Sequence, residues 1–198
     1  MASICKREQK ENDMKIHRTE IEGLSYLEPK IFGDDRGWFY ESWNRERYFE
    51  IGITEDFVQD NFSFSCRSVL RGLHYQKPYT QGKLVSVIEG EVWDVVVDLR
   101  RNSSTFGKWQ GFPLTGEKKE QLYIPKGFAH GFCVVSETAI FHYKCTDKYS
   151  PESEHGIIWN DSTLNIPWPV KDPIISEKDK KYPRFSELTD DLIFFEEV

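Results

Sequence analysis

The chain places a histidine, an arginine and a lysine close together in the stretch that contains Arg71, His74 and Lys83. Histidine titrates near neutral pH and suits proton transfer, whereas the two cations could meet an anionic ligand or a developing oxyanion. On either side, residues 58–65 alternate apolar and polar positions, and residues 84–88 read as the next strand. We therefore predict that the three charged groups lie at strand ends of a β scaffold, over a cavity.

The rest of the sequence predicts short strands separated by turns, with little helix. Strands are expected at residues 38–43, 91–98, 107–112, 120–124, 128–132 and 138–145, and turns at 33–37, 89–90, 115–117 and 125–127. The 115–117 turn is expected to join its two neighbouring strands as a hairpin. One helix is expected from Asn44, which can cap it, to Gly52, which can end it. This pattern indicates an antiparallel sandwich or barrel.

The two ends of the chain differ from this β pattern. Residues 1–14 are polar and predict a loose extension, followed by one domain over residues 15–198. After Pro151 the prolines resist a central strand, so this part is expected to wrap the sandwich. A short helix is expected to start at a Ser176 cap, and no structure is assigned to residues 190–198.

Composition excludes several classes of function. A net charge of −7 argues against a general nucleic-acid binder, although a local basic pocket for a small anion remains compatible with it. No apolar run could span a membrane, and the N-terminus has no hydrophobic signal core. Cys5, Cys66, Cys133 and Cys145 lie far apart without a C-x-x-C spacing, which favours reduced thiols in a cytoplasmic protein.

No metal or cofactor is expected. A metal site in a jelly roll would need a closely spaced pair of histidines, but Gln76 stands two residues after His74 and no His-x-His occurs. The glycine-rich signatures of dinucleotide and nucleotide-triphosphate sites are also absent from the sequence.

Each candidate residue also has a structural interpretation. His74 and His130 could each be a satisfied core histidine, Tyr143 sits on an apolar strand, and Asp179 could be a surface carboxylate. Arg36 lies in a glycine-flanked turn, where it could reach a phosphate or be only a solvated charge.

Nine segments, in order from about Ile31 to Asp179, match a known family. Among them are FGDDRGWFYESWN (32–44), FVQDN (57–61), VLRGLHYQ (69–76), QGKLV (81–85), QLYIPKGFAHGF (121–132), YKCTDKY (143–149) and SEKD (176–179). The chain resembles the RmlC-type sugar-nucleotide epimerases, the dTDP-4-dehydrorhamnose 3,5-epimerase family. The resemblance implies an all-β cupin jelly roll with a few short peripheral helices. It also implies a homodimer that acts without a cofactor on a dTDP-linked 4-keto-6-deoxyhexose.

The resemblance also implies roles for individual residues. It makes His74 the general base, Asp179 its partner, Tyr143 the general acid and Lys83 the cation beside the sugar ketone. It places Arg71 and Arg36 at the pyrophosphate. Further positions that match substrate-contacting residues of the family are Phe32, Glu41, Gln59, Asn61, His130 and Tyr149. The chain departs from the family at Lys148, where an aromatic residue is common, which could alter how the base or nearby sugar is held.

This set suits the inversion of a carbon next to a ketone. A C4 ketone acidifies the protons on both C3 and C5. Inversion at either carbon needs at least a base on one face of the sugar and an acid on the other. Three alternatives stay open at this point. They are a single-carbon epimerase acting at C3 or C5, a cupin that binds a nucleotide sugar without turnover, and a metal-dependent cupin oxygenase.

Overall fold

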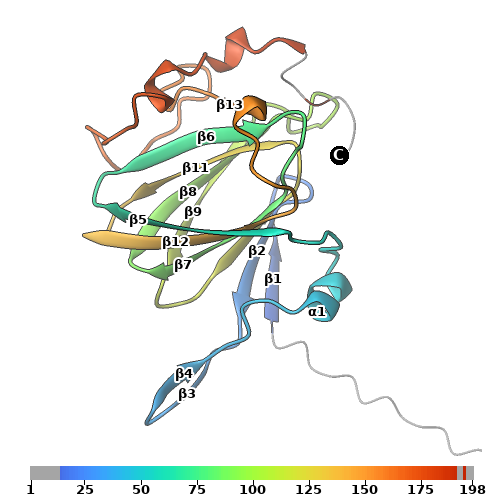
Figure 1. Ribbon diagram of the computed structural model, residues 1–198, viewed down its shortest axis with the longest axis vertical. Helices are drawn as coiled ribbons and strands as arrows, with labels where there is room; N and C mark the ends of the chain where they lie inside the picture. Colours follow the sequence, from blue (N-terminus) through green and yellow to red (C-terminus); the bar gives the residue numbers. More distant parts are fainter. Residues whose placement is uncertain (1–13, 191–193, 195–198) are drawn as a thin grey trace, which may run out of the picture.

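The computed structural model describes residues 14–190 and residue 194, which form a sandwich of two antiparallel sheets (Figure 1). The first sheet has the order β1 (Met14–Arg18), β2 (Ser25–Pro29), β10 (Gln121–Ile124), β7 (Lys83–Glu89), β12 (Thr138–Cys145) and β5 (Gln59–Cys66). The second has the order β13 (Glu154–Gly156), β6 (Leu70–Gln76), β11 (Phe128–Val134), β8 (Glu91–Asp98) and β9 (Trp109–Thr115). The predicted all-β jelly-roll class is confirmed.

Alternation along the strands builds the core between the two sheets. Val85 and Val87 of β7 face Val92 and Val96 of β8, and Phe141 of β12 packs among them. Because successive side chains of a strand point to opposite faces, the inward positions of β6, β7, β11 and β12 continue beyond this apolar core. Those positions hold polar residues, which line a cavity at one end of the sandwich.

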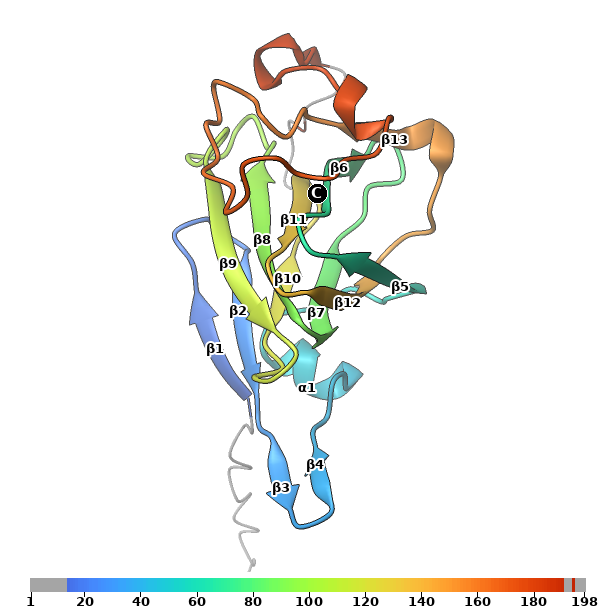
Figure 2. The ribbon, with the colours of Figure 1, turned by 90° about the vertical axis from the view of Figure 1, so that its left-hand side faces the viewer.

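The C-terminal part covers the outer face of the five-stranded sheet, as Figure 2 shows in orange and red. Leu164, Trp168 and Phe185 pack there against Leu73 and Val95. The segment contains the short 3-10 helices η1 (Pro151–Ser153), η2 (Asp179–Lys181) and η3 (Phe185–Glu187). The segment that was predicted to wrap the sandwich is the part of the chain that packs on this face.

The helix expected at Ser176 is only one 3-10 turn, η2. The Ser176 hydroxyl accepts a hydrogen bond from the Asp179 backbone N–H at 3.0 Å. The predicted cap therefore exists, but it orders a single turn.

The predicted first helix is α1 (Arg45–Glu50), and it covers part of the outer face of the six-stranded sheet. The Asn44 side chain accepts a hydrogen bond from the Arg47 N–H, which caps the helix as expected. Tyr48 of this helix is fully buried against Leu27, Leu84 and Tyr123.

Two sequence predictions were wrong. The aromatic strand expected at residues 38–43 is only β4 (Gly37–Phe39), which pairs with β3 (Phe32–Asp34) in a separate hairpin. Residues 40–44 leave that hairpin, since Trp43 packs against the rings of Tyr48 and Phe57 near α1.

The hairpin expected around residues 115–117 does not form either, because β9 pairs with β8 while β10 pairs with β2 and β7 of the other sheet. The connection crosses between the sheets, and the buried Glu120 carboxylate holds it by accepting from the Thr115 N–H and hydroxyl.

The predicted N-terminal extension falls outside the described residues, apart from Met14, which begins β1. Within residues 14–190 and 194, no helix is long and apolar enough to cross a membrane.

Candidate active site

The larger cavity has a volume of about 600 Å³ and opens between the two sheets. Four strands supply its polar walls: His74 from β6, Lys83 from β7, His130 from β11 and Tyr143 from β12. Asp179 reaches the same cavity from the C-terminal segment. The structure thus brings together the four residues predicted to be catalytic.

His74 and Asp179 form a hydrogen-bonded pair. His74 Nε2 lies 3.0 Å from Asp179 Oδ1, and Asp179 Oδ2 accepts from the Gly72 backbone N–H at 3.1 Å. Burial raises the pKa of Asp179, but hydrogen bonds from His74, Gly72 and Ser176 outweigh it and hold that pKa below its usual range. An ionised carboxylate at Nε2 keeps a proton there, which leaves Nδ1 to accept one from a substrate.

Lys83 and Tyr143 face the cavity from adjacent strands. Tyr143 pairs with Val85 and Cys145 pairs with Lys83, so the two functional side chains are diagonal neighbours on the inward face. Desolvation lowers the pKa of Lys83, and burial raises that of Tyr143. The tyrosine is therefore protonated at neutral pH and can donate a proton or a hydrogen bond.

A second histidine lies directly across from the first. His130 of β11 pairs with His74 of β6, and its Nε2 lies 2.8 Å from Oδ2 of the fully buried Asp94. Burial lowers the pKa of His130, which keeps the ring neutral. Sequence reasoning missed Asp94, although it is a charged residue at the core-facing position between Val92 and Val96.

The mouth of the cavity carries charged and aromatic groups. Arg71 lies in its wall, and its Nε and Nη2 both donate to the Ser65 hydroxyl at 3.1 Å. Tyr149 donates to Glu154 Oε2 at 2.5 Å, and Lys178 pairs with the same oxygen at 2.6 Å. Neither Glu154 nor Lys178 was singled out from the sequence, because Glu154 begins the three-residue strand β13 and Lys178 lies in an irregular segment just before η2.

A smaller cavity of about 190 Å³ adjoins the first, because Gln81, Tyr143 and Tyr149 line both. Gln59 and Asn61 face it, and the Gln59 amide donates to Asn61 Oδ1 at 2.9 Å. These two predicted contact residues therefore sit next to the main cavity.

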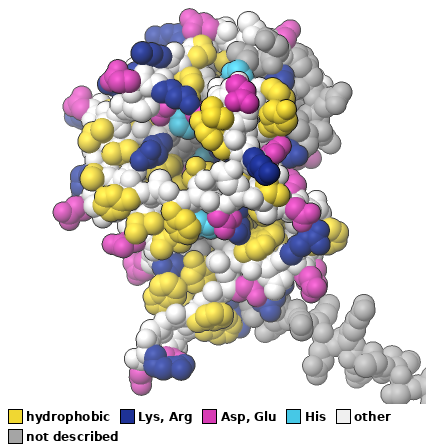
Figure 3. Space-filling model, viewed as in Figure 1, with side chains coloured by type: hydrophobic (Ala, Val, Ile, Leu, Met, Phe, Trp, Pro, Cys, Tyr) yellow, Lys and Arg dark blue, Asp and Glu magenta, His cyan; other side chains and the backbone are white. Residues whose placement is uncertain are grey.

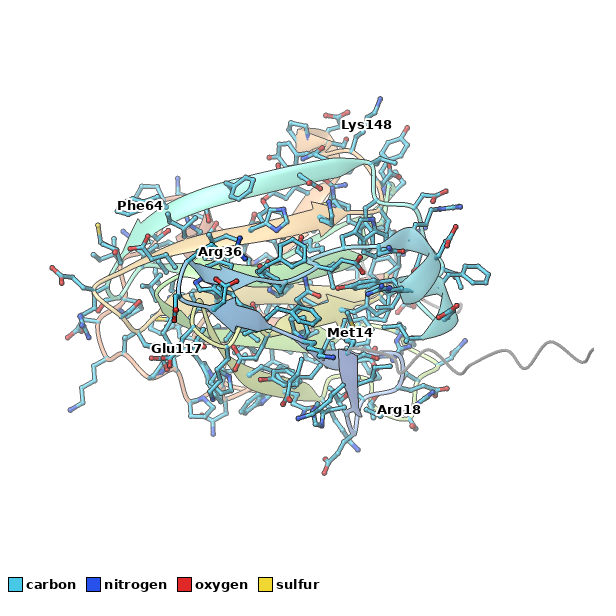
Figure 4. The ribbon with its side chains drawn as sticks, turned by 90° about the horizontal axis from the view of Figure 1, so that it is seen from below. Met14, Arg18, Arg36, Phe64, Glu117 and Lys148 are labelled. Carbon is cyan, nitrogen blue, oxygen red and sulfur yellow. The ribbon has the colours of Figure 1, made fainter. Side chains whose placement is uncertain are left out.

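Three other predicted contact residues line neither cavity: Phe32, Arg36 and Glu41. Phe32 and Arg36 belong to the β3–β4 hairpin, which projects from the lower end of the sandwich in Figures 1 and 2. The Arg36 side chain is 90% exposed and pairs with Asp34. Figure 4, seen from below, labels Arg36 on this hairpin, whereas Lys148, next to Tyr149, lies on another side of the molecule.

The arrangement is suited to enolisation of a ketone. A histidine that can accept a proton, a protonated tyrosine and a cation share one cavity, which also has an arginine at its wall.

Figure 3 shows histidine side chains exposed among hydrophobic ones on the face that carries β5 and β12. Among residues 14–190 and 194, no group of three or more His, Cys, Asp or Glu side chains could hold a metal ion.

Comparisons with known proteins identify close relatives. The family dTDP-4-dehydrorhamnose 3,5-epimerase matches residues 18–187. The dTDP-4-dehydrorhamnose 3,5-epimerase of Shigella flexneri is 53% identical over 174 residues, which cover 87% of this chain and 96% of the relative.

Solved structures agree with this result. The crystal structure of dTDP-6-deoxy-D-glucose-3,5-epimerase from Legionella pneumophila, in complex with dTDP-4-keto-L-rhamnose, is 53% identical with a TM-score of 0.90. The match covers 93% of this chain and 100% of that one. A Bacillus anthracis 3,5-epimerase with TDP and PPi bound is 46% identical, with a TM-score of 0.85 over 86% and 99% of the two chains. The chain therefore belongs to the dTDP-4-dehydrorhamnose 3,5-epimerase family.

Proposed function

We propose that this chain epimerises a dTDP-4-keto-6-deoxyhexose at C3 and C5. The reaction converts dTDP-4-dehydro-6-deoxy-D-glucose to dTDP-4-dehydro-L-rhamnose in dTDP-L-rhamnose biosynthesis. The observation that carries the proposal is the His74–Asp179 pair in one cavity with Tyr143 and Lys83. A protein that only binds the nucleotide sugar has no use for an acid and a base together.

The proposed chemistry uses these four side chains. His74 Nδ1 removes the proton next to the C4 ketone, and Asp179 stabilises the imidazolium that results. Lys83 stabilises the enolate oxygen by its charge. Tyr143 returns a proton from the opposite face, which inverts the carbon. Because the ketone acidifies both of its neighbours, the same set can serve both C3 and C5.

The nucleotide supplies binding energy away from the reacting carbons. Arg71 offers a guanidinium to the diphosphate, and Tyr149, Gln59 and Asn61 offer an aromatic ring and amides around the adjoining cavity. We assign His130, which lines the larger cavity, to the sugar. Its low pKa suits acceptance of a hydrogen bond from a sugar hydroxyl.

A homodimer would give a role to the three contact residues that lie away from the cavities. We place the β3–β4 hairpin of one subunit, which carries Phe32 and Arg36, at the cavity of the other. Glu41 follows the hairpin and pairs with Arg47 of α1, and it would contact the substrate from the same subunit. Phe62 and Phe64 on the outer face of the edge strand β5 are 67% and 62% exposed, which supports burial of this surface by a second copy. A cytoplasmic location fits the separated thiols and remains part of the proposal.

The test is proton NMR of the protein with dTDP-4-keto-6-deoxyglucose in D₂O, without added metal or nicotinamide. We expect deuterium at both C3 and C5, and a coupled reductase then identifies the sugar. Deuterium at C3 alone would replace the proposal with a single-carbon epimerase. Saturable ligand binding without any exchange would leave a binding protein and contradict the proposed activity.

A further inference from the structure

A glycine makes room for an aromatic ring beside the proposed base. Gly156 of β13 pairs with His74 of β6, and a Cβ added to Gly156 would meet Tyr182 Cδ2 and Cε2 at 2.5 Å. The Tyr182 ring lies at 70° to the His74 ring, with the ring centroids 5.6 Å apart. The imidazole is therefore contacted both by Asp179, through a hydrogen bond, and by the ring of Tyr182.

The hydroxyl of Tyr182 extends this contact to a carboxylate. It donates to Glu154 Oε1 at 3.1 Å, while Glu154 Oε2 pairs with Lys178 Nζ at 2.6 Å. Lys178 is the residue before Asp179, so the contacts form a closed ring from His74 through Tyr182, Glu154 and Lys178 to Asp179. Burial raises the pKa of Glu154, but the hydrogen bonds from Lys178 and Tyr149 outweigh it and keep the carboxylate ionised.

The ring of contacts can fix the position of Asp179. This residue lies in a single 3-10 turn of a segment outside both sheets, so side-chain contacts must set its position. The Glu154 side chain is only 10% exposed, and strand β13 fixes it next to β6. The hydrogen bond from Tyr182 to this ionised, mostly buried carboxylate is therefore stronger than one in open solvent, whereas the Lys178 pair is partly screened because the Lys178 side chain is 52% exposed.

We propose that Tyr182 and Glu154 are positioning residues for proton abstraction: they hold the segment that carries Asp179 against β6 and so orient His74. The inference rests on the proposed function, because it assumes that His74 is the base. Misplacement of a reacting group by about 1 Å can cost roughly 10²-fold in rate. Loss of these contacts should therefore lower kcat, with KM largely unchanged.

The first test compares two variants of Tyr182. Tyr182→Leu removes both the ring contact and the hydroxyl, and we expect kcat to fall roughly 10- to 100-fold with KM within about threefold. Tyr182→Phe keeps the ring and loses only the bond to Glu154, so its loss should be smaller. The matched control is Tyr123→Phe, which removes a Tyr–Glu hydrogen bond of 2.5 Å to Glu55 near α1 and should leave kcat unchanged.

The second test is a double-mutant cycle of Tyr182→Phe with Glu154→Ala. Glu154→Ala removes the carboxylate that accepts from the Tyr182 hydroxyl and pairs with Lys178, so this variant should lose kcat. The double variant should then be no worse than Glu154→Ala alone, because Tyr182→Phe removes only a bond that is already absent.

Two results would overturn the inference. They are wild-type kcat in folded Tyr182→Leu, or losses that simply multiply in the double variant. Failure of the proposed function looks different, because the wild-type protein itself would then exchange no deuterium.

Discussion

At the scale of single residues, the proposed chemistry depends on the carboxylate behind the base. Asp179→Asn replaces the charge while keeping the shape, so the imidazolium formed at His74 would lose its stabilisation. We expect kcat to fall roughly 10²- to 10⁴-fold in this variant and in His74→Ala. Deuterium incorporation measures the loss, and Asp56→Asn, which changes an exposed partner of Arg45, is the matched control. A normal rate in His74→Ala would show that another group is the base.

The lowered pKa of Lys83 leads to a separate prediction about how kcat depends on pH. Desolvation lowers its pKa, and its charge is needed when the enolate forms. As pH rises through this lowered pKa, the ammonium loses its proton, so kcat should decline below the pH at which an ordinary lysine titrates. The pKa of Tyr143 is raised, so the tyrosine is not expected to cause this decline.

The measurement is kcat between roughly pH 6 and pH 10 for the wild type and for Lys83→Arg, whose guanidinium stays charged throughout. The arginine variant should be slower near neutral pH but should lack the alkaline decline. An identical decline in both proteins would assign it to a different group.

At the scale of secondary-structure elements, alternation in the sequence predicted most strands well but not their partners. Residues 58–65 and 138–145 alternate or carry β-prone residues, and they became β5 and β12 within one residue at each end. A hairpin was expected over residues 107–124, but β9 and β10 lie in different sheets. The prediction failed because a local turn signal does not reveal whether a connection stays in one sheet or crosses to the other.

The residues of the candidate site also fall into two groups, those whose position a strand pattern predicts and those whose position it does not. His74, Lys83 and Tyr143 lie on strands, where the side-chain period of two brings them to one inward face. Glu154 and Tyr182 reach the same place from β13 and from an irregular segment, through pairings and packing that no local pattern encodes. Only the resemblance to the family, and not the spacing, pointed to Asp179.

The end of β8 provides a prediction about stability. Asp98 is fully buried and accepts hydrogen bonds from Arg100, Ser103 and Thr105, which fold the following loop back onto the strand. Burial raises the pKa of Asp98, but the hydrogen bonds from Arg100 and Thr105 outweigh it and lower that pKa overall. Asp98→Asn should reduce the free energy of unfolding by roughly 2–4 kcal/mol.

Urea denaturation at several pH values tests this prediction. Since the folded-state pKa of Asp98 is below its unfolded value, its contribution is fully present above the unfolded pKa and is lost as pH falls through the folded pKa. The difference between wild type and variant should therefore shrink in acid. The control is Asp56→Asn, which changes an exposed carboxylate and should leave the free energy of unfolding nearly unchanged. If Asp98→Asn changed the free energy of unfolding as little as this control, the buried cluster would add no stability.

At the scale of the whole molecule, charge and shape separate two surfaces. The chain has a net charge of −7, yet the wall of one cavity holds Arg71, Lys83 and Lys178. The same wall holds the carboxylates of Glu154, which pairs with Lys178, and of Asp179, which pairs with His74, so Arg71 and Lys83 are the cations left to meet a diphosphate or an enolate. The hairpin carries Arg36 away from that cavity, and Trp38 and Phe39 beside it are 60% and 68% exposed. A monomer would leave these aromatic rings in water, whereas the proposed dimer would bury them.

Mixing two inactive variants tests this arrangement of subunits. If Arg36 serves the cavity of its partner, a dimer of one Arg36→Ala chain and one His74→Ala chain has one intact cavity, formed by His74 of the first chain and Arg36 of the second. Unfolding and refolding the variants together should then restore roughly a quarter of wild-type activity, since half of the dimers are mixed and each has one good site of two. Light scattering should report a dimer for each protein. If Arg36 instead serves its own cavity, every site in the mixture has a defect and no activity returns.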